Sequence, residues 1–171
     1  MEQINQYPIG KYKEPEVITE EMCMSFIDMI ASFPKNLKSA VMSLDDKQLN
    51  TPYRKGSWTV RQVVHHLADS NINCFARIKF AITEDNPTIK SFAEEKWAEL
   101  LDAKHISILP SLSILEGIHE RWAILLKGLE KQDWNRTFFH PDLNKSQTIA
   151  EAMAKYSWHC SHHLAHIKNQ K

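Results

Sequence analysis

Histidine is concentrated in two short stretches of this 171-residue sequence, HH and HCSHHLAH. Six of the nine histidines lie there: His65, His66, His159, His162, His163 and His166. Neutral imidazole is a common ligand of divalent metal ions, and histidines four residues apart on a helix differ by only about 40° in direction. The spacing therefore indicates a metal site with two ligands from the second stretch and one from the first.

The apolar face of the second stretch favours one pair of histidines. With His159 at zero and about 100° per residue, the apolar side chains around it centre near about 60°, the expected bundle interior. His159 and His163 lie nearest that direction. His166 lies further out, at about −20°, and His162 points most outward, at about −60°. We therefore expect His159 and His163 to bind the metal and His166 to be a nearby pocket group.

His66 is the inward histidine of the first stretch, because the apolar arc of its helix lies to one side of it and His65 points roughly the opposite way. Ser70, Asn73 and Arg77 fall within about 40° of His66 along the same helix. A polar row beside the core predicts a pocket wall, with Asn73 as a pocket candidate and Arg77 as a cofactor-binding one. The alternative for Arg77 is an ion pair at the surface.

Three histidines from two helices would leave one coordination position open, which is typical of a catalytic metal site. A fourth protein ligand, such as His166, would instead favour a metal-binding or partner-binding bundle without turnover. Asp69, about 60° from His66, either orients a ligand ring or faces solvent. Cys160 lies about 100° around the helix from His159, so we expect a packed thiol. Nearby aromatic residues are expected in the core or at interfaces: Trp122, Tyr156 and Trp158.

Four long helices are predicted to position these residues. The sequence has only four glycines, and its apolar residues recur at helical spacing. The predicted helices span about residues 19–42, 59–83, 110–128 and 148–167. Pro34 implies a kink or break in the first. Capping-box pairs mark the other starts: Thr59 with Gln62, Ser113 with Glu116, and Thr148 with Glu151.

The connecting segments complete an all-α four-helix bundle. Residues 1–17 are predicted to form an extended arm, and residues 49–58 a loop or short hairpin. A longer crossover follows the second helix and contains a short helix at about 92–102. Residues 133–146 predict a loop or small hairpin before the last helix. We expect a single domain over residues 1–171.

The composition excludes several classes of function. Lys plus Arg (21) equals Asp plus Glu (21), so no basic field attracts nucleic acid or a membrane surface, and a small-molecule substrate is expected. The N-terminus has no apolar targeting segment, which favours the cytoplasm. The three cysteines lack CxxC spacing, so neither a disulfide framework nor a cysteine zinc site is expected.

Several motifs together resemble one family. YPIGKY, WTVRQVVHHLADSN, HERW, FFHPDL and YSWHCSHHLAHI occur in this order between about residues 7 and 167. They resemble the YfiT-like branch of the DinB superfamily of metal-dependent enzymes. The family's HPE- or HPxxG-like loop reads His140-Pro141-Asp142-Leu143-Asn144 here, so the glycine is absent.

This resemblance implies a four-helix bundle that binds one zinc or nickel ion through His66, His159 and His163. It also implies a homodimer and a metal-dependent hydrolase. Several members of the superfamily are instead thiol-dependent transferases or isomerases that use bacillithiol or mycothiol.

The residues leave the choice of reaction open. A zinc hydrolase normally has a carboxylate that takes a proton from water, and no carboxylate has a comparable position in this sequence. A thiol transferase needs less, because the ion itself lowers the pKa of the thiol. Arg77 and His166 could then bind the carboxylates of a small acidic thiol. We expect a hydrolase or a thiol S-transferase.

Overall fold

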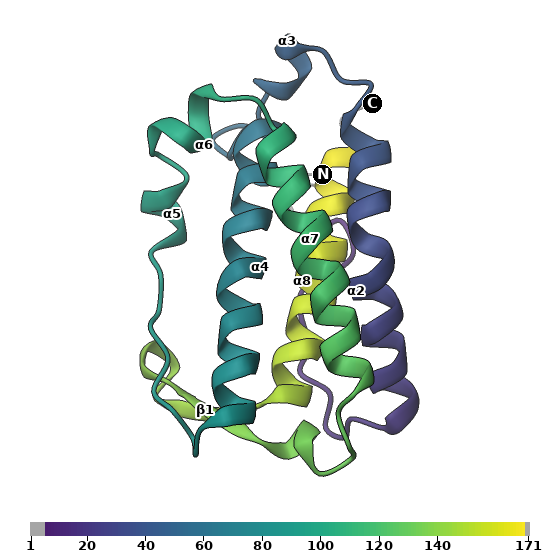
Figure 1. Cartoon of the computed structure of the whole chain (residues 1–171). Coiled ribbons are helices and arrows are strands. Elements are labelled where there is room, and N and C mark those ends of the chain that lie inside the picture. The colour runs from purple at the N-terminus through teal and green to yellow at the C-terminus, as the bar shows by residue number, and fades with distance from the viewer. Residues whose placement is uncertain (1–5, 170–171) are drawn as a thin grey trace.

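Four long helices form the body of the molecule in the computed structural model, which describes residues 6–169 (Figure 1). They are α2 (Glu20–Val41), α4 (Val60–Thr83), α7 (Leu109–Lys127) and α8 (Ile149–Lys168). Both α2 and α4 pack against α7 and α8, so α4 and α8 are neighbours. The predicted all-α four-helix bundle is confirmed. Residues 1–5 of the predicted arm and the last two residues of the predicted domain lie outside the described range.

Three of the helix starts are capped by a threonine side chain, and two of these caps, at Thr59 and Thr148, were predicted. The side chains of Thr19, Thr59 and Thr148 each accept a hydrogen bond from the backbone N–H three residues later, and the last two belong to full capping boxes. Helix α7 begins at Leu109, within one residue of the predicted start near residue 110, but the predicted capping box at Ser113 is wrong, because the helix has no side-chain cap. Pro110 suits this first turn, where its missing N–H is not needed. Helix α2 continues through Pro34 without a break.

Short elements connect the long helices. Helix α3 (Asp46–Leu49) precedes a small hairpin closed by a bridge between Pro52 and Thr59. The crossover after α4 contains two short helices rather than one, α5 (Glu94–Trp97) and α6 (Leu101–His105). The predicted hairpin before the last helix is present, and follows the 3-10 turn η1 (Asp133–Asn135).

That hairpin consists of β1 (Thr137–His140) and β2 (Lys145–Thr148), paired antiparallel around the 3-10 turn η2 (Pro141–Leu143). The crossover runs beside β1: Phe139 N–H donates to the carbonyl of Pro87 at 2.9 Å, and its own carbonyl accepts from Ile89 N–H at 3.0 Å. These backbone hydrogen bonds hold the start of the crossover against the hairpin, at the lower end of α4 in Figure 1.

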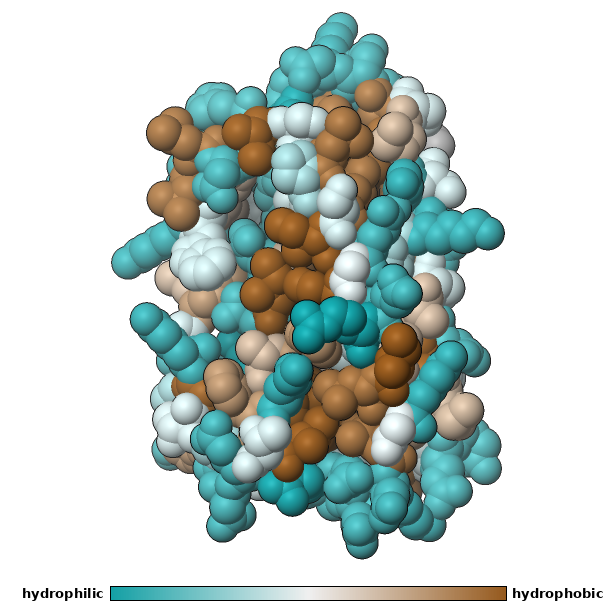
Figure 2. All heavy atoms as spheres, in the orientation of Figure 1, coloured by the Kyte–Doolittle hydropathy of each residue, from teal (hydrophilic) through white to brown (hydrophobic). Residues whose placement is uncertain are grey.

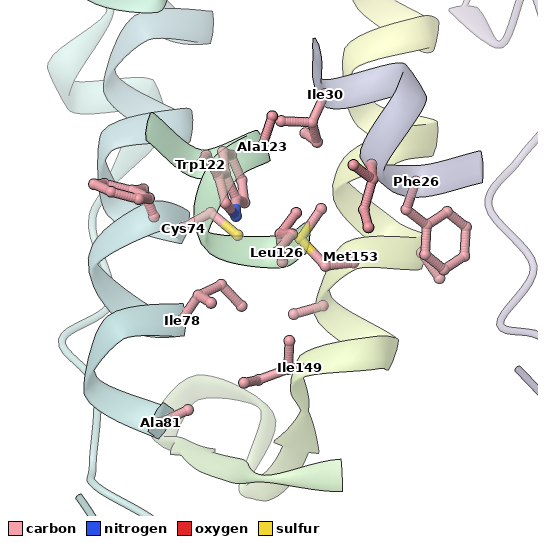
Figure 3. Close-up of a cluster of buried hydrophobic side chains, with 14 of the residues drawn as sticks. Phe26, Ile30, Cys74, Ile78, Ala81, Trp122, Ala123, Leu126, Ile149 and Met153 are labelled. Carbon is pink, nitrogen blue, oxygen red and sulfur yellow. The ribbon is translucent and has the colours of Figure 1, made fainter. Parts of the chain in front are cut away.

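The core is built from the inward faces of all four helices. Figure 3 shows side chains converging from α2 (Phe26, Ile30), α4 (Cys74, Ile78), α7 (Trp122, Leu126) and α8 (Ile149, Met153). A second cluster continues the core and includes Leu37, Leu67, Leu115 and Ile167. Each large apolar side chain buried in this way contributes about 1.5–3 kcal/mol of transfer free energy. The two clusters fix the pairing of α4 with α8.

The outer surface of α4 and α7 mixes apolar and polar side chains. Figure 2 shows hydrophobic side chains along the middle of this face, surrounded by hydrophilic ones. Exposed apolar residues include Ile72 on α4 and Ile114 on α7. Within residues 6–169, no helix has the length and apolar character needed to cross a membrane.

Candidate metal centre

Three histidines meet where α4 packs against α8. His66 comes from α4, and His159 and His163 come from successive turns of α8. One ring nitrogen of each lies within 4.8 Å of one from each of the others. No other group of three or more histidine, cysteine or carboxylate side chains that could hold an ion occurs among the described residues. The structure thus brings together the three residues that the sequence predicts as ligands.

The nitrogen positions suit a shared cation. The Nε2 atoms of His66 and His159 are 3.1 Å apart. Two histidine nitrogens bound to one tetrahedral zinc ion, each at about 2.05 Å, would be separated by roughly 3.3 Å. The ring of His163 completes the triangle, with its centroid 5.1 Å from that of His66 and 4.5 Å from that of His159. A divalent ion therefore fits this donor set.

Burial keeps the three imidazoles neutral. It lowers the pKa of His66 to about 4. The pKa values of His159 and His163 fall well below the ordinary value, first through burial and then through the neighbouring histidines. Metal binding requires the neutral ring with a free lone pair. At neutral pH the site therefore presents its ligands in the form that an ion binds.

Aromatic side chains enclose the three rings. Trp58 packs on His66 with ring centroids 4.7 Å apart, and Phe92 lies on the same imidazole at 6.5 Å. Tyr156 contacts His159 at 5.7 Å. Such packing restricts ring rotation and keeps water away, so that the imidazoles are held in place before an ion arrives.

A cavity of about 300 Å³ opens from the rings of His66 and His159. Arg77 and Ser70 of the predicted polar row line it, together with Tyr156. Asn73 does not line it; its side-chain amide donates to the backbone carbonyl of Asp69 instead. Small-molecule sites usually have volumes from about 300 Å³ upward, so the cavity is large enough for a small ligand.

His166 also lies away from the cavity lining. Its Nε2 is 3.1 Å from the backbone carbonyl oxygen of Gln6, and its ring stacks on Tyr53 with centroids 4.0 Å apart. The side chain therefore joins the N-terminal arm and the 49–58 hairpin to α8. It is not among the three clustered histidines.

His162, which was predicted to point most outward from the bundle, is nevertheless buried, because its side chain is only 7% exposed. It stacks on Trp158 with ring centroids 4.4 Å apart, and Tyr7 of the arm covers it at 5.9 Å. Trp158 also donates from Nε1 to the backbone carbonyl of Gly10 at 3.3 Å. Helical periodicity describes packing between helices, and it does not include the arm that covers this face of α8.

His65 is likewise buried, although it points away from the apolar arc of α4. Its Nδ1 is 2.7 Å from the hydroxyl of Ser111 on α7. The charge of Asp102 on α6 acts on both His65 and Asp69, and burial with that charge raises the pKa of Asp69 to about 6. Asp69 therefore lies on the α6 side of α4, and it has no described interaction with the three clustered histidines.

Several residues of the site were not predicted as site residues from the sequence. Trp58 precedes the cap of α4, Ser91 and Phe92 belong to the crossover, and His140 ends β1. Lys155 and Tyr156 belong to α8, but Tyr156 was expected to be only a core or interface aromatic. All six contact the clustered histidines or line the cavity. Helix spacing could have suggested Lys155, one turn before His159.

Asn144 adopts the backbone conformation for which glycine is usually needed. It has φ 47° and ψ 40°, and its N–H donates to the carbonyl of Pro141 at 3.1 Å. Asparagine tolerates this left-handed region better than other residues with a Cβ atom. The His140-Pro141 turn therefore closes without the glycine, and it places His140 in the cavity lining.

Comparisons with known proteins agree with this architecture. Two proteins, from Bacillus cereus and Bacillus anthracis, are each 51% identical to this chain over 162 residues, covering 95% of it and 92% of their own length. Both are named "putative metal-dependent hydrolase". The solved structure of YfiT from Bacillus subtilis, described as a probable metal-dependent hydrolase with an unusual four-helix bundle topology, is 44% identical. It superposes with a TM-score of 0.94 over 98% of this chain and 95% of its own.

A family model for the DinB superfamily matches residues 30–167, which include the three clustered histidines. The matched range contains all of α4 and α7 and all but the last residue of α8, the helices that build and support the site. The chain therefore belongs to the DinB superfamily, in its YfiT-like branch.

Proposed function

We propose that this chain is a metal-dependent hydrolase or thiol S-transferase, in which His66, His159 and His163 hold one divalent ion beside the substrate cavity. The observation that carries the proposal is the convergence of three neutral imidazoles within 4.8 Å of one another, two of them lining a cavity of about 300 Å³. Three protein ligands leave a coordination position for a reacting group. The names of the relatives support a metal-dependent enzyme.

An ion in this position supplies Lewis acidity and lowers the pKa of water or of a thiol. The protein's own residues orient and shield the reacting groups. Trp58 and Phe92 limit the access of water to His66. Tyr156 is partly buried, and loss of hydration raises its pKa well above the ordinary value, so at neutral pH its hydroxyl is neutral. It therefore serves to donate a hydrogen bond rather than to accept a proton.

The distribution of carboxylates supports thiol transfer as a candidate reaction of equal standing with hydrolysis. Hydrolysis at such a site normally uses a carboxylate beside the ion as a base. Of the acidic residues considered, Asp69 lies on the α6 side, whereas Glu94 and Asp142 line the cavity with exposed side chains. A thiol needs no such base once its pKa is lowered. We therefore place a bacillithiol-type S-transfer beside hydrolysis.

The non-catalytic alternative would need a closed coordination shell. His166 was the candidate fourth ligand for that alternative, but it contacts Gln6 and Tyr53 instead. The cavity beside His66 and His159 also gives a ligand access to the site. Both observations favour turnover. Zinc and nickel are the proposed ions, since three nitrogen donors suit either, and a homodimer is the proposed assembly.

One assay separates the two reactions. Protein loaded with zinc or nickel is incubated with an electrophile and, separately, with a panel of esters, each with and without bacillithiol. Formation of the S-conjugate only with thiol and protein supports transfer. Equal consumption of substrate without thiol contradicts transfer and supports hydrolysis. His163→Ala is the control, and full turnover by this variant would contradict a role for the metal site in either reaction.

A further inference from the structure

The cavity beside the three histidines also contains a buried cation. Arg77 lines the cavity, and its side chain is only 8% exposed. Its Nη2 donates to the backbone carbonyl of Lys90 at 3.3 Å, while Nε is buried without a hydrogen-bond partner among the described residues. No carboxylate within residues 6–169 forms an ion pair with it. Its positive charge therefore has no ion-pair partner within the described part of the chain.

An uncompensated buried charge is unfavourable by several kcal/mol. The other buried arginine of the same helix shows the usual solution, because Arg61 pairs with the carboxylate of Asp46 and donates to Asn50. Arg77 has no equivalent partner, although its guanidinium could bind a carboxylate or phosphate through two hydrogen bonds. A ligand that supplies the missing negative charge would account for its retention.

Three further groups of the cavity could bind the same anion. The Nδ1 atom of His140 and the hydroxyl of Ser91 are buried without partners in the part of the chain that is described. Lys155 adds a second positive charge to the lining. Burial and then the charges of Arg77 and Lys155 lower the pKa of His140. Both cations therefore act on the same corner of the cavity.

Glu94 and Asp142 also line the cavity and oppose an anion there. Their side chains are exposed, however, and solvent screens charges in such positions. Arg77 is buried, so its electrostatic interaction with a ligand is screened much less. Of the charged groups that line the cavity, the buried arginine is consequently the one whose interaction with a ligand is least screened.

The arginine and the metal centre are far enough apart to hold two ends of one molecule. Arg77 follows His66 by eleven residues on α4, which corresponds to about 16 Å along the helix axis. The long arginine side chain of a helical residue leans toward the N-terminus of its helix, which shortens this separation. A small elongated ligand could therefore contact both.

We propose that Arg77, with Lys155, His140 and Ser91, forms a subsite for a carboxylate or phosphate group of the substrate or thiol co-substrate, whose reacting group lies at the three histidines. The placement of the reacting group at the three histidines rests on the proposed function. The anion subsite itself does not require the ion.

Calorimetric titration of hexanoate and of inorganic phosphate into metal-free protein tests the subsite. Wild-type protein should bind at least one of them, and Arg77→Met should weaken that binding at least ten-fold. Lys155→Gln should cause a smaller loss of affinity, because the charge of Lys155 is exposed.

The matched control is Arg121→Gln, which removes one positive charge from an exposed position on α7 and should bind the anions as the wild type does. Wild-type affinity in Arg77→Met, or no binding of either anion by the wild type, would overturn the subsite.

Two further measurements keep the outcomes distinct. Circular dichroism of each variant checks folding, and its zinc content checks the metal centre. Normal zinc binding without anion binding would contradict only the subsite. Anion binding without zinc binding would contradict only the proposed function. The same titrations on zinc-loaded protein compare 6-mercaptohexanoate with hexanoate. Tighter binding of the thiol that depends on both Arg77 and His66 assigns the anionic group to a thiol co-substrate. Equal binding of 6-mercaptohexanoate and hexanoate assigns the anionic group to the other substrate.

Discussion

Buried histidines occupy two kinds of environment in this molecule. His66, His159 and His163 face one another between α4 and α8. His119 on α7 is alone: it is 1% exposed, its Nδ1 donates to the carbonyl of Ile30 at 2.7 Å, and its ring stacks on Phe33.

Neither burial nor a low pKa distinguishes these environments. Burial lowers the pKa of both His66 and His119 to about 4. Buried ring nitrogens without a hydrogen-bond partner occur in both as well, at His159 Nδ1 and His119 Nε2. The difference is convergence, since only the first group brings several lone pairs close enough to share one ion. A metal site is therefore recognised here by the geometry between histidines and not by the environment of each.

The largest expected effect comes from breaking that convergence. His66→Ala should reduce bound zinc or nickel from about one ion per chain to none, because two remaining imidazoles hold a divalent ion far more weakly. The helical circular dichroism spectrum should be retained. Elemental analysis of protein purified without a chelating resin measures the metal, and His163→Ala should behave in the same way. Full metal occupancy in either variant would remove the central claim.

The isolated histidine should show the opposite pattern. His119→Ala removes a buried ring and its hydrogen bond to Ile30, so the free energy of unfolding should fall by about 3 kcal/mol. Its metal content should equal that of the wild type. Urea unfolding and elemental analysis of the same preparation measure both quantities. Loss of the ion from this folded variant would show that the two environments are coupled.

The pH dependence of stability sharpens the comparison further. The pKa of His119 is about 4 in the folded protein and about 6.5 in an unfolded chain. As the pH falls below 6.5 the unfolded state takes up a proton first, so the stabilisation present at neutral pH is lost as the pH approaches 4. Between pH 7 and pH 5 this one group should account for about 2 kcal/mol. Between these pH values, the free energy of unfolding measured in urea should therefore fall by about 2 kcal/mol less for metal-free His119→Gln than for the metal-free wild type. Equal falls in the two proteins would contradict a low pKa for His119.

The smallest effect is expected at His65. Ser111→Ala removes the hydroxyl that lies 2.7 Å from His65 Nδ1, and a single neutral hydrogen bond contributes about 1 kcal/mol. Thermal unfolding should detect this loss, with the metal content unchanged. Because His65 is adjacent in sequence to His66, a loss of metal here would mean that the orientation of α4 depends on this contact.

The residues of the candidate site differ in how far the sequence could predict them. His159 and His163 lie nearest the apolar face of α8, and their spacing fixes their common direction once the helix forms. His162 does not follow this logic, because the arm residue Tyr7 covers it. Asn73 shares the direction of His66 but bonds to its own helix at Asp69 instead. Direction on a helix thus predicts which side chains can meet, and competing local contacts decide which of them do.

The amino-acid sequence by itself determined the four helices, the threonine caps of α4 and α8 and the common direction of His159 and His163, because these depend on interactions within a few residues. Only the tertiary structure decided that α4 lies beside α8, that Trp58 and Phe92 enclose His66, and that Arg77 is buried without a counter-charge. The packing of distant segments sets these relations, and helix periodicity contains no information about which faces will meet. The three histidines were thus predictable as candidates, but their convergence on one point depended on the fold.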